Sequence, residues 1–437
     1  MPDKPPTRSH LDDRLRMRPA VAAAAFDAGD RRGADAFNTV LTRGLAAGAS
    51  DIHLEMLPSG LRVRYRIDGV LRPQTFGPLQ TVLDTTMREV VSRVKILAKL
   101  DIAERRRPQD GSFRTIVDRN GAKAGVDLRV SVVPSHTGES VVIRVLDRSR
   151  APRSIDALAL APAVAARIRE VLARTTGIFL VTGPTGSGES TTLYACLMHL
   201  HRPEIRILTA EDPVEYVYDE LSQCEVNEAI GNTFAGYLRV FLRHDPEVIM
   251  VGEIRDRETA EMAFRAAQTG HLLLSTLHTN SAVAALPRLL DLQIEPALVA
   301  SSLAGVLSQR LARRICEACR REYAPSADDV AAFFAAPPRH LVFVQGGGCD
   351  ACHHTGYRGR LILSDLWIPD EADGARIARG APMDDIHRGA ARTSITMADD
   401  AHGRLAAGET TIEELRRVLP HQAIVEYRAR YGRMSGG

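Results

Sequence analysis

A glycine-rich stretch, Gly183-Pro-Thr-Gly-Ser-Gly-Glu-Ser190, lies between an apolar run and an apolar helical segment. This spacing is typical of a phosphate-binding loop. In such a loop the glycines let backbone N–H groups converge on phosphate oxygens, and the following helix adds the positive end of its dipole. An ordinary glycine-rich turn is the alternative, and the strand–loop–helix order argues against it. We therefore predict a nucleotide site with Ser190 as Mg²⁺ ligand and the following contact residues: Gly183, Pro184, Thr185, Gly186, Ser187, Gly188, Glu189, Ser190 and Thr191.

Glu189 stands where this loop pattern requires lysine. The lysine of such loops brings positive charge to the β- and γ-phosphates, and a carboxylate reverses that sign. One unit-charge interaction at about 4 Å is worth about 4 kcal/mol at an effective dielectric of about 20. The exchange therefore costs several kcal/mol if the carboxylate is ionised and faces the ligand. The only lysines are Lys4, Lys95, Lys99 and Lys123, so a compensating cation must be an arginine, or Lys95 or Lys99 from the first domain.

Acidic and histidine side chains stand at the ends of three further apolar runs. Glu211 and Glu253 each close such a run, and His271 and His278 flank the next one. Ligands of open α/β sheets bind at the carboxyl ends of strands, where a carboxylate can polarise water or hold Mg²⁺. The two histidines are seven positions apart, so strand parity predicts opposite faces and different roles. Any one of these residues alone is commonly a solvated acid or a structural histidine. The prediction rests on three such strands following one phosphate loop.

Four cysteines form two C-x-x-C pairs, Cys316/Cys319 and Cys349/Cys352. Four thiolates in this spacing are typical of a closed, tetrahedral Zn²⁺ site. Such a site has no open position for a catalytic water, so we predict a structural zinc. An iron–sulfur cluster and two redox pairs remain alternatives.

The elements that must position these residues follow from hydrophobic patterning. Short apolar runs at 178–182, 206–210, 248–251 and 272–276 alternate with helical segments, which predicts a mostly parallel α/β sheet covered by helices. Upstream, an alternating strand at 61–67 followed by an Asp-Gly turn predicts a hairpin. A helix at 83–100, further strands at 126–134 and 140–146, and a short helix at 20–26 complete the prediction.

Composition sets outer limits on function. The 437 residues are 45% hydrophobic and 25% charged, which excludes wholesale disorder. The net charge of +2 gives no indication of nucleic-acid binding. No apolar run reaches the roughly 20 residues of a membrane span, and the polar start lacks a signal peptide's apolar segment. We therefore expect a cytoplasmic protein with no direct membrane span and no nucleic-acid partner.

The motifs together resemble a known family. The loop and the stretches at 207–216, 243–256 and 270–280 are similar to the Walker A motif, Asp box, Walker B motif and His box of the ATPases of type II secretion and type IV pilus assembly. The cysteine region resembles the metal-binding insertion of the type II members, of the general secretion pathway protein E type. The resemblance covers residues 36–420 and includes upstream stretches at 49–55, 64–71, 104–114 and 128–146.

The resemblance implies an α/β fold with a RecA-like P-loop ATPase domain preceded by a small, PAS-like α+β domain. We predict six parts: a flexible arm (1–35), the α+β domain (36–146), a linker (147–153), the RecA-like core (154–311), a tetracysteine subdomain (312–365) and a helical C-terminal subdomain (366–437). Compared with longer members, we expect the chain to lack most of their first N-terminal domain, which leaves the docking mode open.

The resemblance also implies roles for single residues. Glu253 would be the general base, Glu211 would organise Mg²⁺ and the γ-phosphate, and His271 and His278 would couple the nucleotide to sheet and subunit contacts. A solvated surface position is the alternative for each arginine, but a planar guanidinium suits phosphate. The arginines that would reach phosphates are Arg129, Arg144, Arg239 and Arg243.

The implied function is an ATPase motor for type II secretion, with ATP, Mg²⁺ and structural Zn²⁺ as cofactors. The implied partners are further copies of the chain, as a hexamer, and inner-membrane platform proteins, at which the chain is peripheral. Three alternatives stay open: a type IV pilus assembly ATPase, a non-hydrolysing scaffold subunit of the same machinery, and a retraction or DNA-uptake motor. The tetracysteine insertion argues against retraction, and Glu189 leaves the remaining ATPase activity open.

Overall fold

The computed structural model describes residues 15–18, 31–119, 122–147, 151–335, 338 and 341–432. Internal contacts divide the chain into two units, 1–150 and 151–437, and each is described by itself. The short helix expected at 20–26 lies outside the described residues. No helix within the described ranges combines the length and the apolar character that a membrane span requires.

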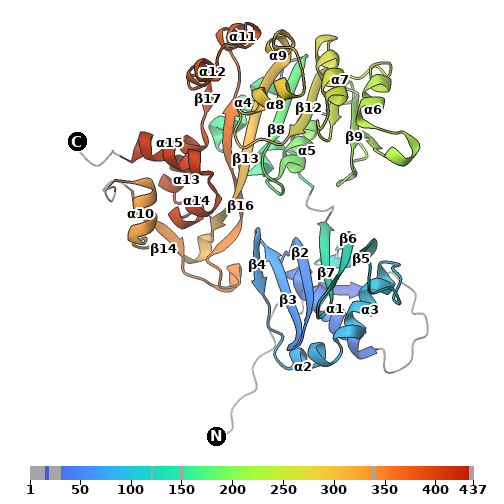
Figure 1. The fold of residues 1–437 in the computed structure, drawn as a ribbon. Coiled ribbons are helices and arrows are strands. Elements are labelled where there is room, and N and C mark those ends of the chain that lie inside the picture. The colour runs from blue at the N-terminus through green and yellow to red at the C-terminus, as the bar shows by residue number, and fades with distance from the viewer. Residues whose placement is uncertain are drawn as a thin grey trace. The chain divides into compact units, whose positions relative to one another are not determined.

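The first unit is one antiparallel sheet with helices packed on it (Figure 1). In β3 the side chains of Leu61, Val63 and Tyr65 are buried while the arginines between them are not, as expected for a sheet with one covered face. The strands, in sheet order, are β1 (Leu15–Arg18), β5 (Gln109–Arg119), β6 (Ala122–Ser135), β7 (Gly138–Asp147), β2 (Asp51–Leu57), β3 (Gly60–Ile67) and β4 (Val70–Pro73). The helices are α1 (Arg31–Ala46), α2 (Pro78–Thr85) and α3 (Met87–Leu97).

Three sequence predictions in this unit can be compared with the structure. The Asp68-Gly69 hairpin is confirmed, since both residues have positive φ and Ile67 pairs with Val70. The single helix expected at 83–100 is wrong, because the backbone leaves helical geometry at Thr86 and separates α2 from α3. The flexible arm is wrong in part: β1 pairs with β5 inside it, and α1 begins before its predicted end.

The second unit contains an eight-stranded sheet with helices on both faces (Figure 1). The predicted mostly parallel sheet is confirmed, because β10, β9, β11, β12, β8 and β13 are parallel. Only the pairings of β16 with β13 and with β17 are antiparallel in this sheet of the described residues. Its strands, in sheet order, are β10 (Ser222–Glu225), β9 (Ile207–Glu211), β11 (Val248–Val251), β12 (Leu272–Leu277), β8 (Gly177–Thr182), β13 (Leu303–Ile315), β16 (Tyr357–Trp367) and β17 (Ser394–Ile395). A two-stranded sheet joins β14 (Arg320–Glu322) to β15 (Val344–Gly346).

Separate hydrophobic clusters on the two faces hold the helices of this unit to the sheet. Every residue of β8 and β12 is buried, because a parallel sheet covered on both sides exposes neither face. The α-helices are α4 (Pro162–Leu172), α5 (Glu189–Leu200), α6 (Phe234–Phe241), α7 (Arg257–Gln268), α8 (Ala285–Asp291), α9 (Pro296–Ser302), α10 (Ala327–Phe333), α11 (Glu371–Ala378), α12 (Met383–Ala390), α13 (Met397–Ala406), α14 (Ile412–Val418) and α15 (His421–Tyr431). Short 3₁₀ turns are η2 (Ile155–Leu158), η3 (Glu228–Ile230), η4 (Glu317–Cys319) and η5 (Asp350–Cys352).

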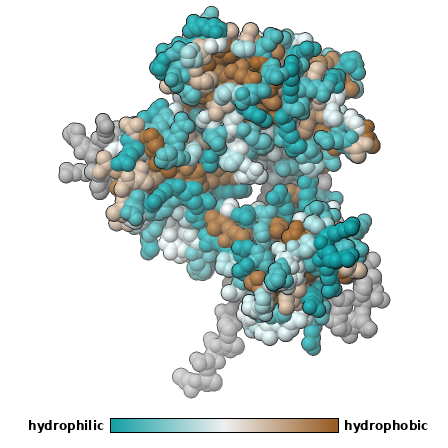
Figure 2. Space-filling view, viewed as in Figure 1, coloured by the Kyte–Doolittle hydropathy of each residue, from teal (hydrophilic) through white to brown (hydrophobic). Residues whose placement is uncertain are grey.

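The tetracysteine region continues directly from the sheet. The strands β13 and β16 pair from Val306 opposite Trp367 to Ile315 opposite Tyr357, and both run on into the cysteine-bearing loops. The subdomain boundaries predicted at 311/312 and 365/366 therefore fall inside strands. Hydrophilic residues cover much of the visible surface of this unit, with apolar patches between them (Figure 2).

Candidate active site

The glycine-rich loop connects β8 to α5, as the sequence predicts. Gly186 and Gly188 have φ of 82° and 91°, in the left-handed region that favours glycine, and Gly188 is the N-cap of α5. At Gly183 a Cβ atom would lie 2.5 Å from the backbone oxygen of Gln309, so no larger side chain fits there. Ser190 and Thr191 lie half-buried in the first turn of α5. The loop thus has the backbone shape of a phosphate-binding loop at a helix N-terminus.

Gln309 of β13 contacts both the loop and the helix, and sequence reasoning missed it. Its Nε2 donates to the Ser187 carbonyl at 2.8 Å, and its Oε1 accepts from the Thr192 hydroxyl at 2.9 Å. The side chain is fully buried. The one available signal was the polar Ser308-Gln309 pair that directly follows the apolar run at 303–307.

Glu189 is folded back against its own loop. Its side chain is 9% exposed, and Oε1 accepts a hydrogen bond from the Ser187 hydroxyl at 2.8 Å. Burial raises the pKa of Glu189 to about 7, the charge of Glu253 acts in the same direction, and Ser187 and His278 act against it. The loop therefore contains a buried carboxyl group where phosphate-binding loops place a cation.

His278 lies between two carboxylates, that of Glu189 at the start of α5 and that of Glu253 just after β11. Its Nδ1 is 3.9 Å from Glu189 Oε2, and its Nε2 is 3.4 Å from Glu253 Oε2. The guanidinium of Arg255 contacts the other oxygen of Glu253 and lies 3.8 Å from Asp212 Oδ2. The structure thus brings together three residues that the sequence singled out, at the carboxyl ends of β8, β11 and β12.

Glu211 belongs to a separate hydrogen-bond network. Its carboxylate accepts bonds from the hydroxyls of Tyr194 and Thr209 and, at 2.9 Å, from Gln223 Nε2. Burial raises the pKa of Glu211 above its ordinary value although these donors act in the opposite direction. The predicted position at a strand end is correct, but the side chain faces α5 and β10 and not His278.

His271 and His278 lie at opposite ends of the same strand, β12. His271 precedes β12 and His278 follows it, and a six-residue strand spans about 20 Å. The Nδ1 of His271 is 2.9 Å from the carbonyl oxygen of Ala266, at the end of α7. The structure therefore does not bring His271 to the loop. The strand-parity argument considered only which face of the sheet each histidine occupies. It did not consider that the two residues lie at different ends of the strand.

The four predicted phosphate-contacting arginines have other neighbours within their own units. Arg239 on α6 contacts Glu258, and Arg243, which follows that helix, donates to the carbonyl of Arg239 at 2.9 Å. In the first unit, Arg129 and Arg144 lie opposite each other on β6 and β7, and both are exposed. Arg144 also contacts Asp51 at 3.2 Å. Like charges directly opposite on neighbouring strands destabilise a sheet unless an anion lies near them.

The four cysteines converge as the sequence predicts. Their sulfur atoms all lie within 4.8 Å of one another, with 3.9 Å between Cys316 and Cys349 and 3.8 Å between Cys319 and Cys352. A tetrahedral site with Zn–S bonds of about 2.3 Å requires sulfur atoms about 3.8 Å apart. The backbone N–H of Gly356 also donates to Cys352 Sγ. The donor set therefore fits a structural Zn²⁺.

A comparison with known families agrees with this arrangement. The pattern that defines the family "Type II/IV secretion system protein" matches residues 29–417. The chain belongs to this family. It is 44% identical to the type II secretion system ATPase E of Vibrio cholerae over 87% of this chain and 74% of that protein. It is 42% identical to the type IV pilus assembly ATPase PilB of Thermus thermophilus over 86% of this chain and 42% of that protein.

Two solved structures of ATPases share the fold of this chain. The pilus retraction motor PilT with bound ADP is 26% identical, with a TM-score of 0.56 over 86% of this chain and 95% of that one. The ATPase DotB of Legionella pneumophila has a TM-score of 0.63 over 93% of this chain and 98% of that one, at 19% identity. These similarities agree with the RecA-like P-loop fold that the sequence predicts.

Proposed function

We propose that the chain is the ATPase motor subunit that powers pseudopilus assembly in type II secretion. The observation that carries the proposal is the convergence of the phosphate loop, His278 and Glu253 at one edge of the sheet. Relatives at 44% and 42% identity are named as a secretion ATPase and a pilus assembly ATPase, which supports the same activity here.

The backbone of residues 183–191 would hold the phosphates, and Ser190 would bind the Mg²⁺ that neutralises them. Glu253 would act as general base toward the attacking water. The contacts of Arg255 and His278 with its two oxygens would hold it in one orientation. Glu211 would act on the phosphates only indirectly, through its hydrogen bond with Tyr194.

Glu189 would weaken nucleotide binding without destroying the site. Its carboxylate is bound to Ser187 inside the loop, so the loop keeps its backbone shape. The loop lacks the cation that would attract the β- and γ-phosphates. We therefore expect slow hydrolysis in the unaltered chain.

The test is ATP hydrolysis by the full chain, measured as phosphate release, in three forms. The unaltered chain should be slow, Glu189→Lys should be fast, and adding Glu253→Gln to Glu189→Lys should return the rate to background. A Glu189→Lys protein that stays at background while folded would sink the motor proposal.

The alternative from a different class is a nucleotide-binding scaffold that modulates an active partner, and Glu189 favours it. Affinity measurements on the unaltered chain distinguish the two functions. Binding of ATP with Mg²⁺ at micromolar affinity together with turnover would exclude the scaffold. A pilus assembly motor remains the second motor candidate, because the PilB relative matches most of this chain.

The proposed assembly is a homo-oligomer, as a hexamer, on an inner-membrane platform and on the cytoplasmic side. We propose no contact with nucleic acid. Arginines would be the cations available to phosphates, and those predicted for this role are Arg129, Arg144, Arg239 and Arg243. Sedimentation with Mg²⁺ and nucleotide tests the oligomer.

Loss of one bound zinc per chain on Cys349→Ser substitution tests the structural metal at the four cysteines.

A further inference from the structure

Gln309 holds one peptide group of the phosphate loop in a fixed orientation. Its Nε2 donates to the Ser187 carbonyl at 2.8 Å. The C=O and N–H of a trans peptide point in opposite directions, so the N–H of Gly188 points away from β13. Among the described residues, this N–H has no hydrogen-bond acceptor. It is therefore available to an oxygen atom of a ligand.

The same side chain ties the loop to the helix that follows it. Gln309 Oε1 accepts from the hydroxyl of Thr192, in the first turn of α5, at 2.9 Å. Both ends of the buried amide thus have partners, which fixes its orientation and makes a rotated amide unfavourable. The loop and the N-terminus of α5 are held to one strand by one residue.

Gln309 also stands on a strand that is anchored at its other end. Residues 309, 311 and 313 share one face of β13 by strand parity. Leu311 lies next to Gly188, and Arg313 makes three hydrogen bonds to Glu414. The position of Gln309 is therefore set by the packed sheet and not by the loop.

We propose that Gln309 is a positioning residue of the nucleotide site, which aims the Gly188 N–H at the phosphates. This rests on the proposed function of the loop. Gln309 does not touch the nucleotide itself. It fixes the peptide group that does, and it keeps the loop open for phosphate when no ligand is bound. Preorganised donors of this kind stabilise the bound ligand without having to reorganise when it arrives.

The test compares Gln309→Met, which removes the donor at nearly constant volume, with the parent chain. Both are made in the Glu189→Lys background, where nucleotide binding is expected to be strong. Affinity for a fluorescent ADP should fall about tenfold, in line with the loss of one or two hydrogen bonds. The KM for ATP should rise by a similar factor while kcat changes less, because the backbone N–H of Gly188 contacts the phosphates both before and during the reaction.

Amide hydrogen exchange gives a readout that needs no nucleotide. Exchange in residues 183–192 should rise at least tenfold in Gln309→Met. Exchange in β12 should stay unchanged. Thr410→Val is the matched control, since it removes a buried hydroxyl that donates to the Arg313 carbonyl on the same strand. It should lower the melting temperature but leave both the loop exchange and the nucleotide affinity at parent values.

Two outcomes overturn the proposal. One is parent-like loop exchange together with parent-like affinity in Gln309→Met. The other is an equal effect on affinity from Thr410→Val, which would mean that general destabilisation of β13 is the cause. If the Glu189→Lys parent binds no nucleotide, the proposed function fails. The exchange measurement then decides on Gln309 alone.

Discussion

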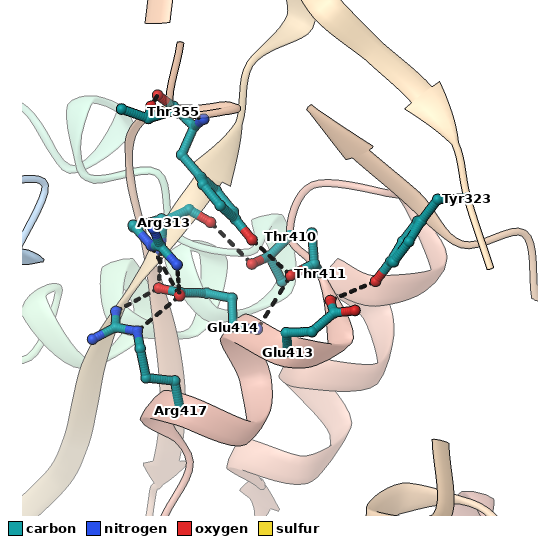
Figure 3. A network of polar contacts seen from close by, with 9 residues as sticks. Arg313, Tyr323, Thr355, Thr410, Thr411, Glu413, Glu414 and Arg417 are labelled. Carbon is teal, nitrogen blue, oxygen red and sulfur yellow. Dashed lines mark hydrogen bonds and ion pairs between the residues drawn. The ribbon is translucent and has the colours of Figure 1, made fainter. Parts of the chain in front are cut away.

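Two buried glutamates, each in the first turn of a helix, have opposite surroundings. Glu189 begins α5 and has one hydroxyl donor, Ser187, with an imidazole 3.9 Å away. Glu414 in α14 accepts two hydrogen bonds from the Arg313 side chain, one from the Arg313 backbone and two from Arg417 (Figure 3). Arg313 in turn lies over the ring of Tyr357 at 3.9 Å.

The pKa values of the two acids move in opposite directions. Burial alone would raise the pKa of Glu414, but the hydrogen bonds from Arg417 and Arg313 outweigh it, and the pKa lies below its ordinary value. At Glu189 burial prevails and the pKa rises to about 7. A buried acid with full cation pairing is typical of a structural network, and one without it is typical of a functional site.

The largest effect is expected at the unpaired acid. Glu189→Lys should raise kcat/KM for ATP about a thousandfold, because it adds a cation near the phosphates and one such contact is worth about 4 kcal/mol. Steady-state hydrolysis measures it. The matched control, Glu371→Lys, makes the same charge change in the first turn of α11 and should leave the rate unchanged.

The paired acid should matter for stability. Glu414→Gln should lower the free energy of unfolding of the second unit by about 3 kcal/mol, because it leaves the largely buried Arg313 without its counter-charge. Urea denaturation measures this loss. The neighbouring substitution Glu413→Gln alters only the bond from Tyr323 and should cost about 1 kcal/mol. Equal losses from the substitutions at 413 and 414 would contradict the assignment of Glu414 as the counter-charge of Arg313.

The same substitution at the loop should have a different outcome. Glu189→Gln should change the free energy of unfolding by less than about 1 kcal/mol, since no buried cation is left unpaired and an amide oxygen can still accept from Ser187. The comparison fails if Glu189→Gln destabilises the chain as much as Glu414→Gln does.

The smallest expected effect is the change with pH in the stability that Glu414 contributes. Because the folded pKa of Glu414 is below its unfolded value, its contribution is fully present above the unfolded pKa of about 4.3 and is lost as pH falls through the folded value. The stability difference between the parent and Glu414→Gln should therefore be constant from pH 7 to about 5 and shrink below that. A difference that grows toward acidic pH would show that Glu414 is not the stabilised carboxylate.

Much of the site could be predicted because its signals are local. The glycines of the loop, the C-x-x-C pairs and the acids after apolar runs are contiguous patterns whose geometry the backbone imposes. Glu253 and His278 meet the loop because neighbouring parallel strands end at one edge.

The failures concern side-chain direction and long-range pairing. Glu211 is at the predicted strand end, yet its carboxylate faces Tyr194, because successive side chains alternate between the faces of the sheet. The boundaries predicted at 311/312 and 365/366 failed because a change in composition was taken for the end of an element, whereas β13 and β16 continue through it.

The amino-acid sequence alone determined the order of strands and helices, the glycine-rich loop with glutamate at its lysine position, and the two C-x-x-C pairs. Only the tertiary structure decided that Gln309 holds the loop from 122 residues away and that Arg313 meets Glu414 across 101 residues. Backbone conformation depends on neighbouring residues, which the sequence displays. Contacts between distant residues depend on strand register and packing, which appear only when the whole sheet is assembled.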